Sequence, residues 1–376
     1  MPNGDPRRVR VLVLIKCLGH GGAEQLLVAT MASRDRERFD YEVAFVLDAK
    51  DALVPAVEAS GVPVHRLGAG GNGDLRWLPR LRRLLATGDF DVLHLHLPYA
   101  AAWGRLVAAS LLPSRRPVII YTEHSLWART AAPVRALNRM TERLDRRVIA
   151  VSEAVMDALP PPARSRAQVI VHGIDLEAAR SAATGRHTVR SELGVEDDEI
   201  LVVTVANLRR EKGIDVLLEA AHRLRSEGAA VKFALAGSGP LEEEVRTLHG
   251  QLGLGDALLL LGGRGDAVRL IAGADIFALA SRHEGLPVTV MEAVTVGTPI
   301  VATAVGELPR LLTDGVDARL VPPDDPGLLA AAIGQLAADP AARERLAHNA
   351  GKLSSLFDIR LATAAIEALY LEVVTR

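Results

Sequence analysis

A repeated alternation of short apolar runs with longer helix-like segments is the feature that most constrains the fold of this chain. The apolar runs fall at 9–15, 41–47, 62–67, 91–95, 118–121 and 147–151, and helical patterns lie near 23–33, 51–60, 75–87, 99–111 and 133–146. Such alternation is typical of a parallel sheet that helices cover on both faces. We therefore expect a Rossmann-like domain over residues 1–175, built from right-handed strand–helix–strand units.

The alternation begins again after a proline-rich stretch, which predicts a second domain of the same architecture. Its apolar runs fall at 200–205, 231–236, 257–261, 276–279 and 299–301. We place the hinge near 172–185 and the second domain over residues 176–355. Residues 356–376 form a helical pattern that either crosses back to the first domain or is an ordinary C-terminal helix. The predicted fold class is α/β, with two doubly wound parallel-sheet domains that face one another across a cleft.

The composition excludes several classes of protein. A net charge of −2 over 376 residues gives no overall attraction for nucleic acid. One cysteine, Cys17, excludes an intramolecular disulfide and fits a reducing compartment. No run of about 18 apolar residues is present to span a membrane, and the first ten residues are too polar for a signal peptide. We therefore expect a cytoplasmic protein.

The stretch 280–292, "ASRHEGLPVTVME", contains the strongest functional signal. Pro287 suits the first turn of a helix, and Gly285 lets a ligand approach the backbone closely. The free N–H groups at such a helix start favour a phosphate. Glu284 and Glu292 would repel a phosphate but can accept hydrogen bonds from sugar hydroxyls. We expect Glu284 to hold a transferred sugar and Glu292 a nucleoside ribose; the alternative is a capped helix with a solvated glutamate.

This stretch resembles the signature of the retaining nucleotide-sugar glycosyltransferases of family 4, also called glycosyltransferase group 1, which have the GT-B fold. The resemblance rests on Glu284, the Gly285-Leu286-Pro287 tripeptide and Glu292 eight positions after Glu284. It covers about 9–374 and is strongest over 200–321. It implies transfer of a sugar from a nucleotide diphosphate, UDP by family habit, to an acceptor hydroxyl, with no cofactor and no metal.

The resemblance also assigns donor-binding roles in the second domain. Gly285, Leu286 and Pro287 would form the donor loop, and Lys212 would neutralise the diphosphate. Where the family usually has Gly-Arg, this chain has Ala206-Asn207, so either Arg209 or Arg210 would replace the missing arginine. Arg264, in "LGGRGD", would flank the nucleotide base. A solvated basic loop is the alternative for the residues from 207 to 212.

In the first domain the resemblance implicates a glycine pair and a histidine. Gly21 and Gly22 separate the first strand from the first helix and would line the cleft between donor and acceptor, although a plain tight turn is the alternative. The sequence there is not GxGxxG, so the nicotinamide fingerprint is absent. His124 follows a strand and would position the sugar and stabilise the transition state. The expected catalytic residues are therefore His124, Lys212 and Glu284.

Two patterns could instead indicate metal binding. His94, His96 and His124 could imitate a three-histidine zinc site, and Asp89 and Asp91 have the Asp-x-Asp form that holds a divalent metal in another glycosyltransferase fold. We favour a packed His94, a His96 that lines the acceptor pocket, and solvated aspartates. His172 departs from the Asn-Gly of the family, and its role stays open.

The acceptor is not readable from the sequence. A lipid-linked sugar in surface polysaccharide or glycolipid assembly is expected, with a soluble natural product as the alternative. Two segments, 77–85 and 134–147, combine an apolar stripe with a cationic stripe, and in the second the apolar stripe is expected to be buried: Val134, Leu137, Met140 and Leu144. Such basic faces are either solvated or make a peripheral contact with an anionic membrane at its inner face.

Three other functions stay open at this point. A glycoside hydrolase would use Glu284 and Glu292 as acid and base. A sugar-nucleotide epimerase would share the two-domain fold, although the signature argues against it. A non-catalytic module that binds sugar nucleotides is the third.

Overall fold

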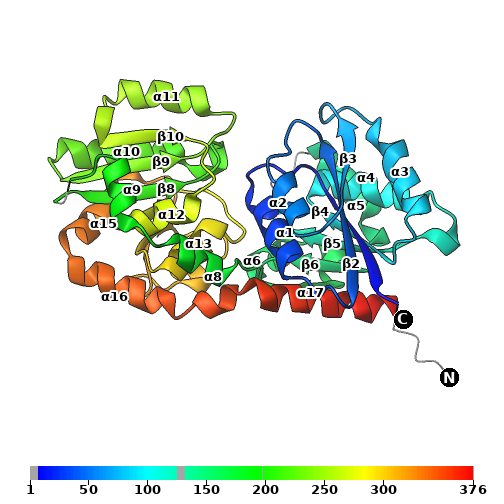
Figure 1. Cartoon of the computed structure of the whole chain (residues 1–376). Coiled ribbons are helices and arrows are strands. Elements are labelled where there is room, and N and C mark those ends of the chain that lie inside the picture. The colour runs from blue at the N-terminus through cyan, green and yellow to red at the C-terminus, as the bar shows by residue number, and fades with distance from the viewer. Residues whose placement is uncertain (1–6, 125–131, 197, 376) are drawn as a thin grey trace. The chain divides into compact units, whose positions relative to one another are not determined.

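The computed structural model describes residues 7–124, 132–196 and 198–375. The chain divides into two compact units, which are coloured along the sequence in Figure 1: unit 1 comprises residues 1–173 and 359–376, and unit 2 comprises residues 174–358. The expected boundaries were 175 and 355. The first six residues, which belong to the polar stretch considered above, lie outside the described residues. Each unit is a parallel sheet between helices, which confirms the predicted α/β fold class.

Unit 1 contains a seven-stranded parallel sheet in the order β3-β2-β1-β4-β5-β6-β7. The strands are β1 (Val9–Ile15), β2 (Phe39–Leu47), β3 (Val64–Ala69), β4 (Val92–His96), β5 (Val118–Glu123), β6 (Arg147–Ala150) and β7 (Ala167–Val169). The three residues of β7 are only half-buried at the sheet edge, so this strand lacks the apolar run that identifies the others.

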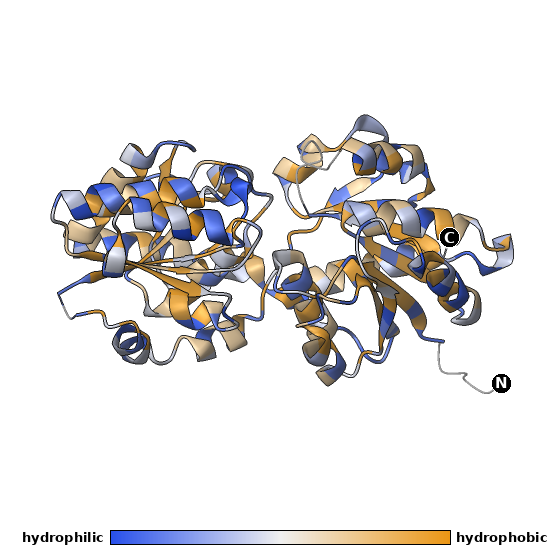
Figure 2. Cartoon of the chain, turned by 90° about the horizontal axis from the view of Figure 1, so that it is seen from above, coloured by the Kyte–Doolittle hydropathy of each residue, from blue (hydrophilic) through white to orange (hydrophobic). Residues whose placement is uncertain are grey.

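Helices cover both faces of this sheet. They are α1 (Gly22–Ser33), α2 (Val54–Ala59), α3 (Trp77–Thr87), α4 (Pro98–Ala109), α5 (Ala132–Thr141), α6 (Glu153–Ala158), α7 (Pro161–Arg164) and α17 (Ile359–Val374), with 3₁₀ turns η1 (Pro113–Arg115) and η3 (Glu142–Leu144). The cores on the two faces are mainly aliphatic; one also contains Trp77, and the other also contains Phe45 and Tyr370. In Figure 2 the strands are mostly apolar, whereas the helices mix apolar and polar residues.

The C-terminal helix α17 belongs to unit 1 and packs beside α1. Ile366 and Tyr370 join the core on that face of the sheet. The Tyr370 hydroxyl lies 2.5 Å from Nδ1 of His94. Arg147 forms an ion pair with Glu372 at 2.8 Å. Apolar burial combined with these polar contacts accounts for the attachment of the last helix to the first sheet.

Unit 2 contains a six-stranded parallel sheet in the order β10-β9-β8-β11-β12-β13. The strands are β8 (Ile200–Val205), β9 (Val231–Ala236), β10 (Leu258–Gly262), β11 (Ile276–Leu279), β12 (Ile300–Thr303) and β13 (Arg319–Val321). The helices are α8 (Leu176–Ala182), α9 (Arg186–Glu192), α10 (Ile214–Ser226), α11 (Glu242–Gln251), α12 (Ala267–Gly273), α13 (Val288–Val296), α14 (Leu308–Leu311), α15 (Pro326–Ala338) and α16 (Pro340–Gly351), with 3₁₀ turns η4 (Arg210–Lys212), η5 (Gly255–Ala257) and η6 (Ser354–Phe357).

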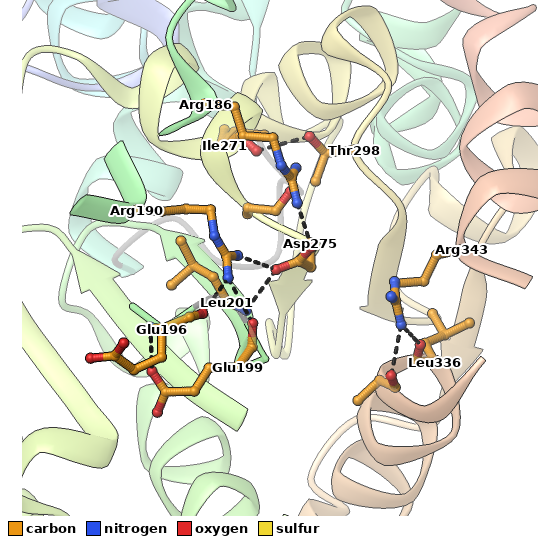
Figure 3. A network of polar contacts seen from close by, with 12 residues as sticks. Arg186, Arg190, Glu196, Glu199, Leu201, Ile271, Asp275, Thr298, Leu336 and Arg343 are labelled. Carbon is orange, nitrogen blue, oxygen red and sulfur yellow. Dashed lines mark hydrogen bonds and ion pairs between the residues drawn. The ribbon is translucent and has the colours of Figure 1, made fainter. Parts of the chain in front are cut away.

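A polar network at the amino end of β11 ties α9 to the sheet of unit 2 (Figure 3). The Asp275 carboxylate accepts hydrogen bonds from the Leu201 amide at 2.9 Å and from Arg190 at 2.7 Å. Arg186 also forms an ion pair with Asp275. These contacts hold α9 and the start of β8 and β11 together, and leave the carboxyl ends of the strands for binding.

Among the described residues, no helix is both long enough and apolar enough to cross a membrane.

Candidate functional site

Most candidate residues of unit 2 lie in loops that follow three neighbouring strands. β8, β11 and β12 are adjacent in the sheet, and the loops 206–213, 280–287 and 304–307 leave their carboxyl ends. In open α/β sheets, ligands bind outside this edge. The topology therefore brings Lys212, Glu284 and the start of α13 to one edge of the sheet.

Lys212 and Glu284 form an ion pair in which Nζ lies 2.6 Å from Oε1. The Ser281 hydroxyl donates to the same oxygen at 2.6 Å. Glu284 is only 9% exposed, so the pair is largely shielded from water and the attraction is stronger than at an open surface. The structure thus holds one cation and one carboxylate in fixed positions beside the helix start.

Two glycines allow these loops to pack backbone against backbone. Gly213 and Gly306 have φ angles of 58° and 59°, in the left-handed region. A Cβ atom would lie 2.1 Å from the Ala280 carbonyl oxygen at Gly213, and 2.1 Å from the Glu284 carbonyl oxygen at Gly306. No side chain fits at either position, so the backbone around Glu284 is tightly enclosed.

Arg282 anchors the loop that carries Glu284, a role that the sequence analysis did not assign. Its guanidinium donates to both carboxylate oxygens of Asp215, at 2.8 and 2.6 Å, and to the Arg210 carbonyl at 2.9 Å. It also pairs with Asp324. These bonds lower the pKa of Asp215 and raise the pKa of Arg282. Arg282 therefore positions the loop and does not offer free donors to a ligand.

Helix α13 presents an uncapped start to this region. It begins at Val288, and Pro287 is its N-cap residue with an extended backbone, one position before the first helical residue. No side chain caps the first turn. Free N–H groups and the positive end of the helix dipole make this end suitable for an anion.

Glu292 extends from the second turn of α13 and has an unusual environment. Its Oε2 is buried and has no hydrogen-bond partner among the described residues. Burial raises the pKa of the Glu292 carboxyl to about 7. A buried carboxylate without donors is costly, so this oxygen needs either a proton or a ligand that donates to it. Sugar hydroxyls are donors of that kind.

The two expected arginines differ in their surroundings. Arg264 donates to both oxygens of Asp266, at 2.8 and 2.7 Å, and to Glu192 at 2.7 Å. Its donors are thus largely engaged, and only the face of the guanidinium is left to flank a base. Arg209 is exposed and lies two positions after Asn207, immediately before η4. Arg210, the first residue of η4, is also exposed. Either can reach an anion without breaking a buried contact.

The glycine pair of unit 1 lies beside a buried carboxylate. Gly21 is the N-cap residue of α1, and a Cβ there would lie 2.1 Å from the Glu24 carboxylate. Glu24 is buried and accepts a hydrogen bond from the Cys17 thiol at 3.1 Å. A carboxylate of the protein therefore lies at the helix start where Gly21 and Gly22 were expected to admit a ligand. Burial and Glu24 raise the pKa of Cys17 to about 11, which leaves the thiol unreactive.

Four histidines of unit 1 gather near the carboxyl ends of β4 and β5. Nδ1 of His96 lies 2.9 Å from Nε2 of His124, and the rings of His124 and His172 are 5.4 Å apart. His94 lies between the Thr122 hydroxyl, at 2.7 Å from Nε2, and the Tyr370 hydroxyl. Burial lowers the pKa of all four, to about 3 for His94 and about 4 for His172. All four imidazoles are therefore neutral at pH 7.

These contacts do not suit the metal sites considered from the sequence. Both nitrogens of His94 face hydroxyl groups, and Nδ1 of His96 faces Nε2 of His124. Asp91 accepts from the Arg10 amide at 2.9 Å and pairs with Arg7. Within the part of the chain that the structure describes, no group of three His, Cys, Asp or Glu residues is arranged to hold a metal ion.

Comparison with protein families assigns both halves of the chain. Residues 9–178 match the family described as Glycosyltransferase Family 4, and residues 185–353 match the family described as Glycosyl transferases group 1.

Individual relatives agree with these families. The chain is 30% identical over 314 residues to D-inositol 3-phosphate glycosyltransferase of Xylanimonas cellulosilytica, which covers 77% of this chain and 74% of that protein. It is 26% identical over 323 residues to alpha-D-kanosaminyltransferase of Streptomyces kanamyceticus, with 82% and 84% covered. The crystal structure of Anabaena HepE with UDP and glucose gives a TM-score of 0.84 at 23% identity, covering 97% of this chain and 100% of that chain. That likeness shows a shared fold.

Proposed function

The chain belongs to the glycosyltransferases of group 1 and family 4 and has their GT-B fold, and on that premise we propose the donor, the stereochemistry and the residues of its reaction. The proposed reaction moves a sugar from a UDP-sugar to an acceptor hydroxyl with retention at the anomeric carbon. The Anabaena relative was crystallised with UDP, which supports the choice of nucleotide.

The buried, unpartnered Oε2 of Glu292 is the observation that carries this proposal. It lies on α13, whose uncapped start is suited to a diphosphate. In the proposed complex the diphosphate lies at the start of α13 beside Gly285, Leu286 and Pro287, and the ribose hydroxyls donate to Glu292. The same helix then binds both the charged part and the polyol part of one nucleotide.

Lys212 and Glu284 take catalytic roles in this proposal. An incoming diphosphate competes with Glu284 for the Lys212 ammonium, because both are anionic acceptors. Lys212 then stabilises the negative charge that builds up on the departing diphosphate. Glu284, released from the lysine, accepts hydrogen bonds from the hydroxyls of the transferred sugar. His124 of unit 1 positions that sugar as a neutral imidazole, and Arg209 and Arg264 complete the donor site.

The proposed acceptor is a lipid-linked sugar in surface polysaccharide or glycolipid assembly. A soluble natural-product acceptor is the second candidate, because alpha-D-kanosaminyltransferase is among the relatives. We place the enzyme in the cytoplasm, with a peripheral contact to anionic membrane through the basic helices of unit 1. Residues 1–175 carry 24 Lys and Arg against 18 Asp and Glu, and the positive balance supports that contact.

A panel of radiolabelled nucleotide sugars, assayed with and without lipid-linked and soluble acceptors, tests the proposal. We expect acceptor-dependent incorporation of sugar from one UDP-sugar. The axial or equatorial configuration of the new linkage at the anomeric carbon, measured by NMR, should match that of the donor. Release of free sugar without an acceptor would instead identify a glycoside hydrolase, and conversion of the donor alone would identify an epimerase. Tight UDP binding with no turnover of any donor would leave a non-catalytic binding module.

A further inference from the structure

Helix α5 of unit 1 and the turn η3 that follows it are oriented with their polar side inward. Asn138, Thr141, Glu142 and Asp145 are buried, whereas Met140 is 78% exposed and Leu144 is 42% exposed. The sequence predicted that Met140 and Leu144 would be buried, and this prediction was wrong. Val134 and Leu137, the first half of the apolar stripe, are half-buried, so only its second half faces outward, although a surface helix normally buries the whole stripe.

Arg105 on α4 determines which side of α5 faces inward. Its fully buried guanidinium donates to both carboxylate oxygens of Asp145, at 2.7 and 2.8 Å, and to the Asn138 side-chain oxygen at 2.7 Å. It also lies 4.7 Å from the centre of the Tyr121 ring. A buried arginine needs these partners, and turning α5 to bury Met140 would remove them.

The outward face therefore combines apolar side chains with unpaired positive charge. Arg139, Arg143 and Arg146 are exposed, and their guanidinium groups form no ion pair with any described residue. No exposed residue from 132 to 146 is acidic. We call the set Arg139, Met140, Arg143, Leu144 and Arg146 the α5 surface.

Helix α3, the other basic candidate, lacks this combination. It buries Trp77, Leu81 and Leu85, and none of its large apolar side chains is exposed. Arg82 and Arg83 project from it as exposed cations, as on an ordinary solvated helix. Charge alone therefore does not distinguish the two helices, but exposed apolar area does.

We propose that the α5 surface is the part of unit 1 that docks on an anionic lipid bilayer. This inference rests on the membrane contact of the proposed function and assigns that contact to one segment of unit 1. Arginines draw the surface to anionic head groups, and Met140 and Leu144 enter the boundary between head groups and acyl chains. Association of two copies of this chain through the same surface is the contrary outcome that the following experiment detects.

Co-sedimentation of the whole protein with vesicles tests the proposal. One set of vesicles contains phosphatidylcholine alone, and the other contains about one third phosphatidylglycerol. We expect binding to the anionic vesicles only, and weaker binding as salt rises. Arg139→Gln with Arg143→Gln should weaken binding about 30-fold, because each arginine near the surface contributes about fivefold. Met140→Ser with Leu144→Ser should weaken it several-fold and leave the salt dependence in place.

The matched control is Arg82→Gln with Arg83→Gln on α3, which removes the same charge from a face without exposed apolar residues. We expect this variant to lose much less binding than the α5 pair. Equal loss in both pairs, or binding to both kinds of vesicle alike, would overturn the proposal. So would self-association of the wild type, seen by light scattering and abolished by Met140→Ser with Leu144→Ser.

Vesicle binding is measured without donor or acceptor, so its outcome is independent of the transferase assay. All three pairs of substitutions replace exposed side chains, and the thermal unfolding of these variants should match that of the wild type. Failure of the α5 proposal would leave the donor site of unit 2 untouched, and failure of the proposed reaction would leave the membrane contact standing.

Discussion

The Lys212–Glu284 pair leads to a direct prediction about single residues. Lys212→Ala removes the cation that meets the leaving diphosphate, so kcat/KM should fall about 10²- to 10³-fold, as when one preorganised donor is lost from a charge-stabilising site. Initial-rate kinetics with the active donor measure this. Lys352→Ala, at an exposed position after α16, serves as the control and should be neutral. An active Lys212→Ala enzyme would remove Lys212 from the mechanism.

Glu292 leads to a prediction about pH. Because burial raises the pKa of this carboxyl from 4.5 to about 7, the folded state holds the proton more tightly than the unfolded state. The contribution of Glu292 to stability is therefore complete below about pH 4.5 and is lost as the pH rises through about 7. Between pH 5 and 8 the unfolding free energy of the wild type should fall by on the order of 2–3 kcal/mol relative to that of Glu292→Gln.

Chemical denaturation of the two proteins at pH 5 and 8 checks this prediction. A constant difference between them across that range would mean that Glu292 ionises normally. Added UDP should reduce the difference at pH 8, because ribose hydroxyls would then donate to the carboxylate.

Some site residues were predictable from the sequence because their chemistry is local. Glu284, Gly285 and Glu292 occur within nine positions, and their spacing around a helix start was readable. Arg264 was predicted without its partners, since Glu192 lies 72 positions away and only the fold brings it within 2.7 Å. The contact of Gly21 with the Glu24 carboxylate, which folds back onto the helix start, could not be read from the sequence either.

At the scale of elements, the loop after β12 depends on a glycine for two separate reasons. Gly306 has a positive φ and also lies against the Glu284 carbonyl, whereas Gly297, the residue that ends α13, has a φ of 75° with no atom within 4 Å of an added Cβ. Gly297→Ala should cost about 1 kcal/mol of unfolding free energy through backbone strain alone.

Gly306→Ala should cost about 1–3 kcal/mol more than Gly297→Ala, because the added methyl group overlaps the backbone of the donor loop. Urea denaturation of both variants measures the difference. Equal losses would show that the loop has room for a side chain and that its close packing has no energetic importance.

For helix α5 and the turn η3, the sequence predicted the wrong side as buried at Met140 and Leu144. A period of 3.6 residues identified the helix and its apolar stripe, but periodicity does not show what lies opposite. The deciding group is Arg105, more than thirty positions earlier in the chain, whose buried charge requires Asp145 and Asn138 as partners. Burial of a charge is a stronger constraint here than burial of Met140 and Leu144.

This explanation predicts the effect of removing the arginine. Arg105→Met leaves Asp145 buried without its partner and should lower the unfolding free energy by about 3–5 kcal/mol. Arg105→Met combined with Asp145→Leu should recover much of the loss, since no unpaired charge remains. Denaturation curves for both variants test this, and a double variant as unstable as the single one would contradict it.

At the scale of the whole molecule, the fold was predictable because parallel sheets have a strong sequence signal. Central strands such as β11, and β1 from Val11 onward, are buried on both faces and are continuously apolar. The half-buried edge strand β7 lacks that signal and was missed. The position of the C-terminal helix could not be predicted from the sequence either. The contacts of α17 with unit 1 join residues hundreds of positions apart, such as Tyr370 and His94.

The account as a whole depends on unit 2 binding a nucleotide diphosphate through one helix. A crystal structure of the protein grown with UDP measures this most directly. We predict that the diphosphate oxygens lie within hydrogen-bond distance of the N–H groups at the start of α13 and that a ribose hydroxyl donates to Glu292. UDP bound elsewhere in unit 2, with Oε2 of Glu292 still unpartnered, would contradict the account.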